Sequence, residues 1–309
     1  MLMNLRAAYG EALLALAGEN KNVVALDADL CGSTQSVVVE KNYPERYFEM
    51  GIGEQNMISV AAGLALTGKI PFAHSFSVFA TGRPFDQIRQ SVCLPNLNVK
   101  IVGSSCGLSD FGDGATHQSF EDLATMRVLP HMTVLCPADG IEVKWAVRAA
   151  AAVDGPVYIR LNRNDLPVLF DEKTPFEIGK PLVVKEGSDV ALVCTGTMTS
   201  IALDAAALLE QQGISARVVH LGTIKPLCGK SLREALGNVR GIVSCEEHTI
   251  YGGLGSAVAE ALCEAPLPMK MVGIQDRYGQ STVCYEELLE CYGLTKEAVA
   301  KAAEALLKK

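Results

Sequence analysis

Short apolar runs alternate with stretches of helical periodicity along the whole chain. In the first half, aliphatic and β-branched runs predict buried strands, and amphipathic stretches between them predict helices. This alternation favours a parallel sheet covered by helices on both faces. The predicted strands are 23–27, 70–74, 99–103, 133–136 and 157–161. The predicted helices are 7–16, 54–67, 83–92 and 141–153.

A segment rich in proline, glycine and charge, residues 167–188, interrupts this alternation and is typical of a linker. The alternation then resumes. Further strands are predicted at 190–194, 216–220, 241–245 and 269–274, and further helices at 200–211, 255–263, 285–291 and 296–307. We therefore expect an α/β protein of two doubly wound domains, with boundaries at 1–170, 171–186 (linker) and 187–309.

Composition narrows the class of protein. The chain has 309 residues, and its net charge of −8 argues against nonspecific nucleic-acid binding. Its ten cysteines are scattered, without a Cys-x-x-Cys pair, so structural zinc is not expected. The sequence shows neither an apolar run long enough to span a bilayer nor a signal-peptide pattern, and reduced thiols fit a cytoplasmic protein.

One candidate site combines a carboxylate with two aromatic residues. Glu54 follows the turn formed by Gly51 and Gly53 and begins a predicted helix, where a negative charge is favourable by itself. Phe76 and Phe79 follow the next predicted strand, and core packing is their ordinary role. Together, a carboxylate on a tight turn and two rings can hold a flat heterocycle.

A second candidate segment, GDGATHQ at 112–118, places Asp113 and His117 close together in sequence. Read alone, the segment is a turn followed by a loop histidine. His117 is also a plausible proton relay, because histidine titrates nearest neutral pH.

The segments GIGEQNM (51–57) and SFSVF (75–79) resemble motifs of transketolase-like thiamine diphosphate enzymes. The resemblance implies that Glu54, next to Gly53, contacts N1′ of the cofactor's pyrimidine and promotes deprotonation of its thiazolium carbon. Phe76 and Phe79 match the aromatic residues that pack on the pyrimidine. The resemblance thus implies a pyrimidine-binding domain followed by a transketolase-type C-terminal domain.

The GDGATHQ segment is similar to the transketolase motif whose Asp and His bind sugar hydroxyls, and this implies a substrate role for Asp113 and a substrate and catalytic role for His117. Gln118 and the Phe-x-x-Phe spacing favour transketolase over deoxyxylulose-phosphate synthase and over the β subunit of 2-oxoacid dehydrogenases. A non-catalytic regulatory relic of the family is a further alternative.

Further matches involve the substrate phosphate. The stretch NRNDLP at 162–167 resembles the family segment whose Arg binds phosphate, which makes Arg163 a candidate. The stretch 27–33 similarly implies Asp29 near the cofactor and Ser33 near the phosphate, with Arg6 as a second phosphate ligand. Without the resemblance, Arg163 could fix the linker, and Asp29 and Ser33 could cap a helix.

Two departures from the family pattern limit the interpretation. Ser105 occupies about the place of a histidine that transketolases use for phosphate, which leaves the range of acceptor sugars open. The family's diphosphate and Mg²⁺ motif, a Gly-Asp-Gly followed at moderate distance by Asn, is absent, because the next Asn after Gly114 is Asn162. The resemblance therefore covers only the two C-terminal domains of a complete enzyme.

The resemblance implies that this chain is the C-terminal subunit of a split transketolase of the pentose phosphate pathway. Thiamine diphosphate would be shared with an N-terminal partner that holds Mg²⁺, with no metal ligand on this chain. The expected assembly is a two-fold heterotetramer, and the expected reaction moves a two-carbon ketol unit from a ketose phosphate to an aldose phosphate.

The glycine-rich stretch at 252–255 invites a nucleotide-binding interpretation, but it lacks the full spacing and the acidic residue of that motif. Its resemblance to transketolase C-terminal domains implies an architectural role instead. We expect His248, just before it, to be a structural or subunit-contact residue.

Overall fold

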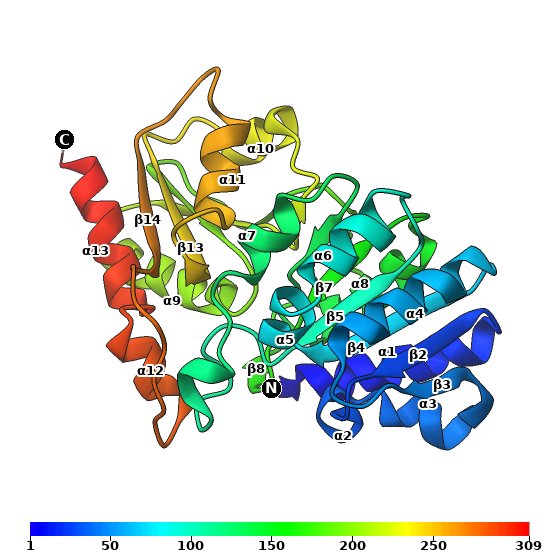
Figure 1. The fold of residues 1–309 in the computed structure, drawn as a ribbon. Helices are drawn as coiled ribbons and strands as arrows, with labels where there is room; N and C mark the ends of the chain where they lie inside the picture. Colours follow the sequence, from blue (N-terminus) through cyan, green and yellow to red (C-terminus); the bar gives the residue numbers. More distant parts are fainter. Residues whose placement is uncertain (309) are drawn as a thin grey trace.

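Two twisted sheets with helices packed against them form the body of the chain (Figure 1). The structure is a computed structural model and describes residues 1–308. The first sheet has the strand order β12-β6-β7-β5-β4-β2-β3, and its neighbours are parallel except that β12 is antiparallel to β6. Its strands are β2 (Val23–Asp27), β3 (Tyr47–Glu49), β4 (Ile70–Phe76), β5 (Lys100–Ser104), β6 (Thr133–Leu135), β7 (Val157–Arg160) and β12 (Thr223–Lys225).

The second sheet has the order β14-β13-β10-β11-β9, in which β9 is the antiparallel edge strand. Its strands are β9 (Leu182–Lys185), β10 (Val190–Cys194), β11 (Ala216–His220), β13 (Ile242–Thr249) and β14 (Met269–Ile274). A short antiparallel pair, β1 (Leu2–Asn4) and β8 (Asp165–Pro167), ties the start of the chain to the end of the first domain.

Helices cover the faces of both sheets (Figure 1). Those of the first half are α1 (Leu5–Glu19), α2 (Cys31–Thr34), α3 (Val37–Asn42), α4 (Glu54–Leu66), α5 (Ser77–Gly82), α6 (Phe85–Gln87), α7 (Asp122–Arg127) and α8 (Gly140–Ala152), with 3₁₀ turns at Pro44–Arg46 and Gly114–Thr116 and a π-helical segment at Ile88–Cys93. Those of the second half are α9 (Met198–Gln211), α10 (Gly229–Leu236), α11 (Leu254–Ala261), α12 (Tyr285–Cys291) and α13 (Lys296–Leu307).

Burial on both faces explains the parallel arrangement. The strand β2 is buried at every position, as expected where helices cover both sides of a sheet. On one side, α1 and α8 contribute Leu13 and Val147 to a common core. On the other side, α4 contributes Met57 and Ile58. The loops at the carboxyl ends of the strands are thereby held on a rigid frame.

The two halves of the chain are joined by a strand of the second half that pairs with the first sheet, and by a buried ion pair. The strand β12 follows β11 in the chain but pairs with β6 of the first sheet. His220 on β11 lies 2.8 Å from Glu142 of α8 through its Nε2 and the carboxylate Oε2, and both side chains are buried. The pair of His220 and Glu142 therefore helps to hold the second sheet in place against the first half of the chain.

The predicted α/β fold is confirmed, and the predicted buried strands agree with the structure to within a few residues. The prediction missed β9, which lies inside the segment interpreted as a linker, because this half-buried edge strand is flanked by proline, glycine and charge. The predicted helix 83–92 agrees with a helical segment from Phe85 to Cys93, but the prediction missed that the part from Ile88 onward is a π-helix. The domain boundaries themselves stay a prediction.

Within residues 1–308, no helix is both long enough and apolar enough to cross a membrane.

Candidate active site

Apart from Arg6 of α1, the candidate residues lie at or beyond the carboxyl ends of β2, β3, β4, β5 and β7, the edge at which parallel sheets usually bind ligands. Glu54 is the first residue of α4, directly after its N-cap Gly53. Its side chain is only 4% exposed, and its Oε1 accepts a 2.6 Å hydrogen bond from Nη1 of Arg83. The structure therefore places the carboxylate inside the protein, paired with a cation.

Two parallel rings and a histidine lie next to one another in this site. Phe76, at the end of β4, and Phe79, in α5, have ring centres 6.2 Å apart and planes inclined by 18°. The His117 ring meets Phe79 edge-on at 5.2 Å and Phe76 at 6.4 Å. Thr116 fixes this imidazole, since its Oγ1 is 2.9 Å from Nδ1 of His117. The fold thus brings together the two separate motifs predicted from sequence.

Two arginines, Arg163 and Arg6, lie near one another in this site, and Arg163 also lies near Phe76. Arg163 forms a 2.5 Å ion pair with Oδ1 of Asp110, and its guanidinium carbon is 6.0 Å from the centre of the Phe76 ring. Nη1 of Arg6 donates to the main-chain oxygen of Ser33 at 3.2 Å. Burial and the nearby charge of Arg163 lower the pKa of Arg6. Two cations held this close form a site suited to an anion.

Asp113 is exposed beside Asp110. Burial raises the pKa of the Asp110 carboxyl, Arg163 opposes that shift, and the neighbouring Asp113 adds to it. Asp113 therefore belongs to the same polar group as Arg163, with its side chain free to meet solvent or a ligand.

Asp29 lies in a strained loop after β2, with φ of 62°. Its main-chain N–H donates to Oε1 of Glu49 at 2.9 Å, and the N–H of Gly51 donates to the same oxygen at 2.8 Å. Glu49 therefore ties the loop of Asp29 to the turn that precedes Glu54. Positive φ in a residue other than glycine is a feature that clusters at functional sites.

Two site residues, Arg83 and Asp110, were missed by the sequence analysis. Arg83 pairs with Glu54 and also places its guanidinium carbon 4.0 Å from the centre of the Phe79 ring. The only sign of a site role in the sequence was position: Arg83 lies shortly after the SFSVF segment, and Asp110 lies just before the GDGATHQ segment. Each neutralises a charged residue that the sequence analysis did identify.

Ser105 does not offer a surface group in place of the family's histidine. The residue is fully buried, its φ is 54°, and its hydroxyl has no hydrogen-bond partner within residues 1–308. The anion site therefore depends on arginines rather than on an imidazole at this position.

The main-chain N–H groups of the glycine-rich stretch at the start of α11 bind a carboxylate of this chain. Glu246 accepts hydrogen bonds from the main-chain N–H groups of Leu254 at 2.6 Å and Gly255 at 2.8 Å. The donors that a phosphate would need are already used. His248 is buried beside this carboxylate, and burial lowers its pKa to about 4, which favours the neutral imidazole.

No group of three or more His, Cys, Asp or Glu side chains in the described part of the chain has the arrangement of a metal site.

Comparison with known proteins identifies the family. Residues 2–168 match the family model "Transketolase, pyrimidine binding domain", and residues 179–299 match "Transketolase, C-terminal domain". The chain is 44% identical to an inferred transketolase C-terminal section of Methanocaldococcus jannaschii, over 99% of this chain and 96% of that protein. It is 40% identical to the 6-deoxy-6-sulfo-D-fructose transketolase subunit SqwH of Clostridium sp., over 99% of this chain and 95% of the relative.

A solved structure described as a split gene transketolase, inactive beta4 tetramer, superposes with a TM-score of 0.91 at 48% identity and covers 99% of both chains. The chain therefore belongs to the transketolase family. Within that family, it corresponds to the C-terminal section of an enzyme whose two halves are separate chains.

Proposed function

We propose that this chain is the C-terminal subunit of a thiamine diphosphate-dependent transketolase, which moves a two-carbon ketol unit from a ketose to an aldose. The observation that carries the proposal is the buried Glu54 carboxylate at the start of α4, which Arg83 links to the ring of Phe79, while His117 contacts both Phe79 and Phe76. An architectural helix charge needs no aromatic pair next to it.

The residues present fit the aminopyrimidine part of the cofactor. Glu54 offers a carboxyl group in a place shielded from water, where a hydrogen bond to a ring nitrogen is strong. Phe76 and Phe79 offer apolar faces for a flat ring. When bound, thiamine diphosphate supplies the carbon nucleophile and the electron sink for C–C cleavage. Glu54 would hold or share the proton at N1′ of the pyrimidine.

The polar groups around His117 would bind the sugar. Asp113 and His117 would meet hydroxyl groups near the reacting carbon, and His117 would move a proton to or from a sugar oxygen. Arg163, Arg6 and the segment of Ser33 would bind the anionic end of the substrate. The Clostridium relative is described for a sulfonated sugar, and a sulfonate is also an anion that two arginines can bind, so phosphate and sulfonate sugars are both candidates.

The remaining half of the site would come from an N-terminal partner subunit. The diphosphate and Mg²⁺ motif is absent from this sequence, and the chain corresponds to a C-terminal section of the family. The related split-gene transketolase structure is an inactive beta4 tetramer, which supports both self-association and dependence on a partner. We infer a two-fold heterotetramer, the closed arrangement that most soluble oligomers favour.

The proposal is tested by Glu54→Gln in the complex with the N-terminal subunit. Gln is nearly isosteric but cannot share a proton with N1′, so we expect ketol transfer to fall by about 10²–10⁴-fold. Exchange of the C2 proton of bound cofactor, followed by NMR, should slow in parallel. Normal exchange with only a lowered melting temperature would mean that Glu54 is a helix-start residue. A wild-type complex without ketol transfer would favour the regulatory alternative.

A further inference from the structure

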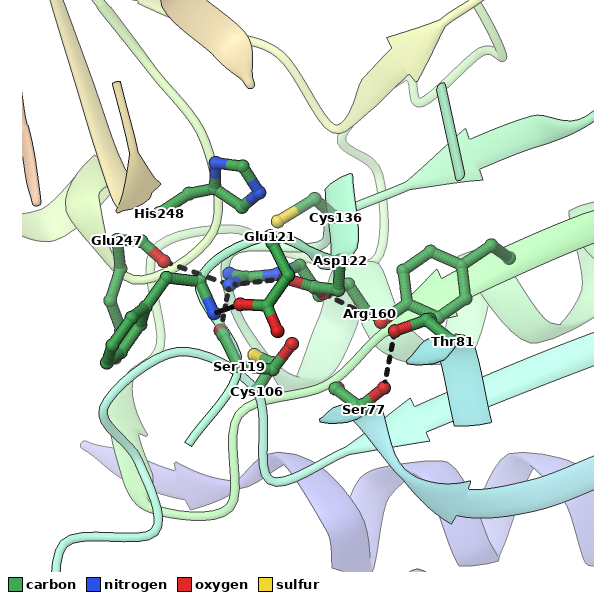
Figure 2. A network of polar contacts seen from close by, with 12 residues as sticks. Ser77, Thr81, Cys106, Ser119, Glu121, Asp122, Cys136, Arg160, Glu247 and His248 are labelled. Atoms are coloured by element: carbon green, nitrogen blue, oxygen red, sulfur yellow. Dashed lines mark hydrogen bonds and ion pairs between the residues drawn. The ribbon is translucent and has the colours of Figure 1, made fainter. Parts of the chain in front are cut away.

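A buried ion pair between Arg160 and Asp122 connects the two halves of the chain (Figure 2). Arg160 on β7 and Asp122 at the start of α7 have side chains 3% and 0% exposed. Nε of Arg160 donates to Oδ2 of Asp122 at 2.7 Å, and Nη2 donates to Oδ1 at 3.2 Å. Nη2 also donates to the main-chain oxygen of Glu247 on β13 at 2.9 Å. The pair is therefore bidentate and bonded to the second sheet.

The attraction between Asp122 and Arg160 favours the charged form of both side chains. Burial of the Asp122 carboxyl would raise its pKa, but the Arg160 guanidinium outweighs that effect and the pKa lies below its ordinary value. A charged pair buried in this way has little freedom to rearrange, because an unpaired charge here would be strongly unfavourable.

Tyr158 extends this pair toward the candidate active site. Its hydroxyl donates to Oδ2 of Asp122 at 2.7 Å, so its remaining capacity is that of an acceptor. A Cβ atom placed on Gly103 of β5 would collide with the Tyr158 hydroxyl and lie 2.7 Å from the Ser77 hydroxyl. The two hydroxyls therefore lie against the same glycine, which leaves room for both. The Ser77 hydroxyl is buried and makes no hydrogen bond at ordinary geometry within residues 1–308, but it lies close enough to Tyr158 to oppose the rise that burial causes in the pKa of that residue.

Ser77 lies at the base of the aromatic pair. It is the first residue of α5 and stands between Phe76 and Phe79 in the chain. Its main-chain oxygen accepts a 2.7 Å hydrogen bond from Oγ1 of Thr81, one turn later in the same helix. A restraint on the Ser77 side chain would therefore act on the first residue of α5, next to Phe76 and two residues before Phe79.

We propose that Tyr158 is a positioning residue that, through Ser77, fixes the aromatic pair relative to the buried Asp122–Arg160 ion pair and hence to the second sheet. Its significance for the cofactor rests on the proposed function, but its effect on α5 does not. The hydroxyl of Tyr158 has this positioning role, whereas its ring packs in the hydrophobic core.

Three variants isolate the hydroxyl pair. Tyr158→Phe removes one hydroxyl and keeps the ring, Ser77→Ala removes the other, and the double variant removes both. In the cofactor-free complex with the N-terminal subunit, we expect faster hydrogen exchange of the α5 amides in each single variant. Calorimetry should show thiamine diphosphate binding weakened by about tenfold in each. Because both single variants remove the same contact between Tyr158 and Ser77, the double variant should bind thiamine diphosphate no more weakly than either single variant.

The matched control is Tyr292→Phe, which removes a part-buried hydroxyl that donates to the main-chain oxygen of Tyr278 at 2.7 Å in the second domain. It should leave exchange in α5 unchanged. Unchanged α5 exchange in Tyr158→Phe, or additive effects in the double variant, would overturn the proposal. Should Tyr158→Phe fail to fold, unchanged exchange in Ser77→Ala would overturn it equally. A wild-type complex that binds no thiamine diphosphate would refute the proposed function, while the exchange comparison would still decide the role of Tyr158.

Discussion

The guanidinium of Arg83 donates a 2.6 Å hydrogen bond to the Glu54 carboxylate and lies 4.0 Å from the centre of the Phe79 ring. In the chain without cofactor, Arg83 therefore binds the same carboxylate that we propose to bind N1′ of the pyrimidine. Its side chain is 45% exposed, whereas that of Glu54 is 4% exposed. The arginine can move toward solvent, but the carboxylate cannot.

We predict that Arg83→Met destabilises the cofactor-free complex by about 1 kcal/mol, because a buried acceptor loses its donor while the exposed cation contributes little. Cofactor binding no longer has to break the Arg83 bond, so thiamine diphosphate should raise the melting temperature more in the variant than in the wild type. Thermal melts with and without cofactor measure both effects. Arg148→Met, which breaks an exposed pair with Glu19, is the control. Equal cofactor effects in wild type and Arg83→Met would contradict the prediction.

Without its partner, the chain should bind thiamine diphosphate weakly and show no ketol transfer. The reason is that the diphosphate and Mg²⁺ motif is absent from the sequence. Calorimetry and a transfer assay on the purified chain test this, and adding the N-terminal subunit should restore turnover. Robust turnover by the chain alone would show that the diphosphate half of the site is not needed from a partner.

Arg163→Ala should raise KM for an anionic sugar by about 10- to 100-fold and change kcat little. A guanidinium that binds a remote anion does so equally in the ground state and the transition state. A donor sugar without an anionic group should show no such change, and this comparison separates lost anion binding from general damage. Asp110 would lose its partner too, so a melting curve must accompany the kinetics. Equal losses with both sugars would assign Arg163 another role.

The sequence predicts the parts of the site that are local in the chain. Glu54 and the pair Phe76 and Phe79 fall in short motifs, and the rule that loops at the carboxyl ends of parallel strands meet brings His117 to them. The contact of Arg83 was missed because it depends on how the chain turns between α5 and α6: the prediction began a helix at Arg83, whereas this residue directly follows α5.

Long-range pairing accounts for the remaining omissions. Arg160 reaches Asp122 across 38 positions in sequence and Glu247 across 87. Nothing in a local pattern distinguishes such a buried arginine from one on the surface, since only tertiary packing supplies its partners. The same applies to β12, a short segment that joins the first sheet although it follows β11 of the second.

The pair of His220 and Glu142 predicts a specific dependence of stability on pH. Burial alone would lower the pKa of His220, but the Glu142 carboxylate, whose Oε2 is 2.8 Å from Nε2, raises it to about 10. An unfolded histidine titrates near pH ~6.5. Because the folded pKa is the higher one, the stabilisation is fully present below pH ~6.5 and is lost as the pH rises toward about 10.

We therefore predict that Glu142→Gln lowers the free energy of unfolding by about 3 kcal/mol near pH ~6.5, as expected when one partner of a buried pair is removed. The difference between wild type and variant should shrink as the pH rises toward about 10, where the wild-type imidazole is also losing its proton. Comparing the two proteins at each pH cancels the titration of all other groups. Denaturant unfolding at several pH values measures the difference. Glu19→Gln is the control, because its exposed pair with Arg148 contains no histidine and should give a small difference at every pH. A difference for Glu142→Gln that stays constant or grows with pH would show that His220 is not charged in the folded chain.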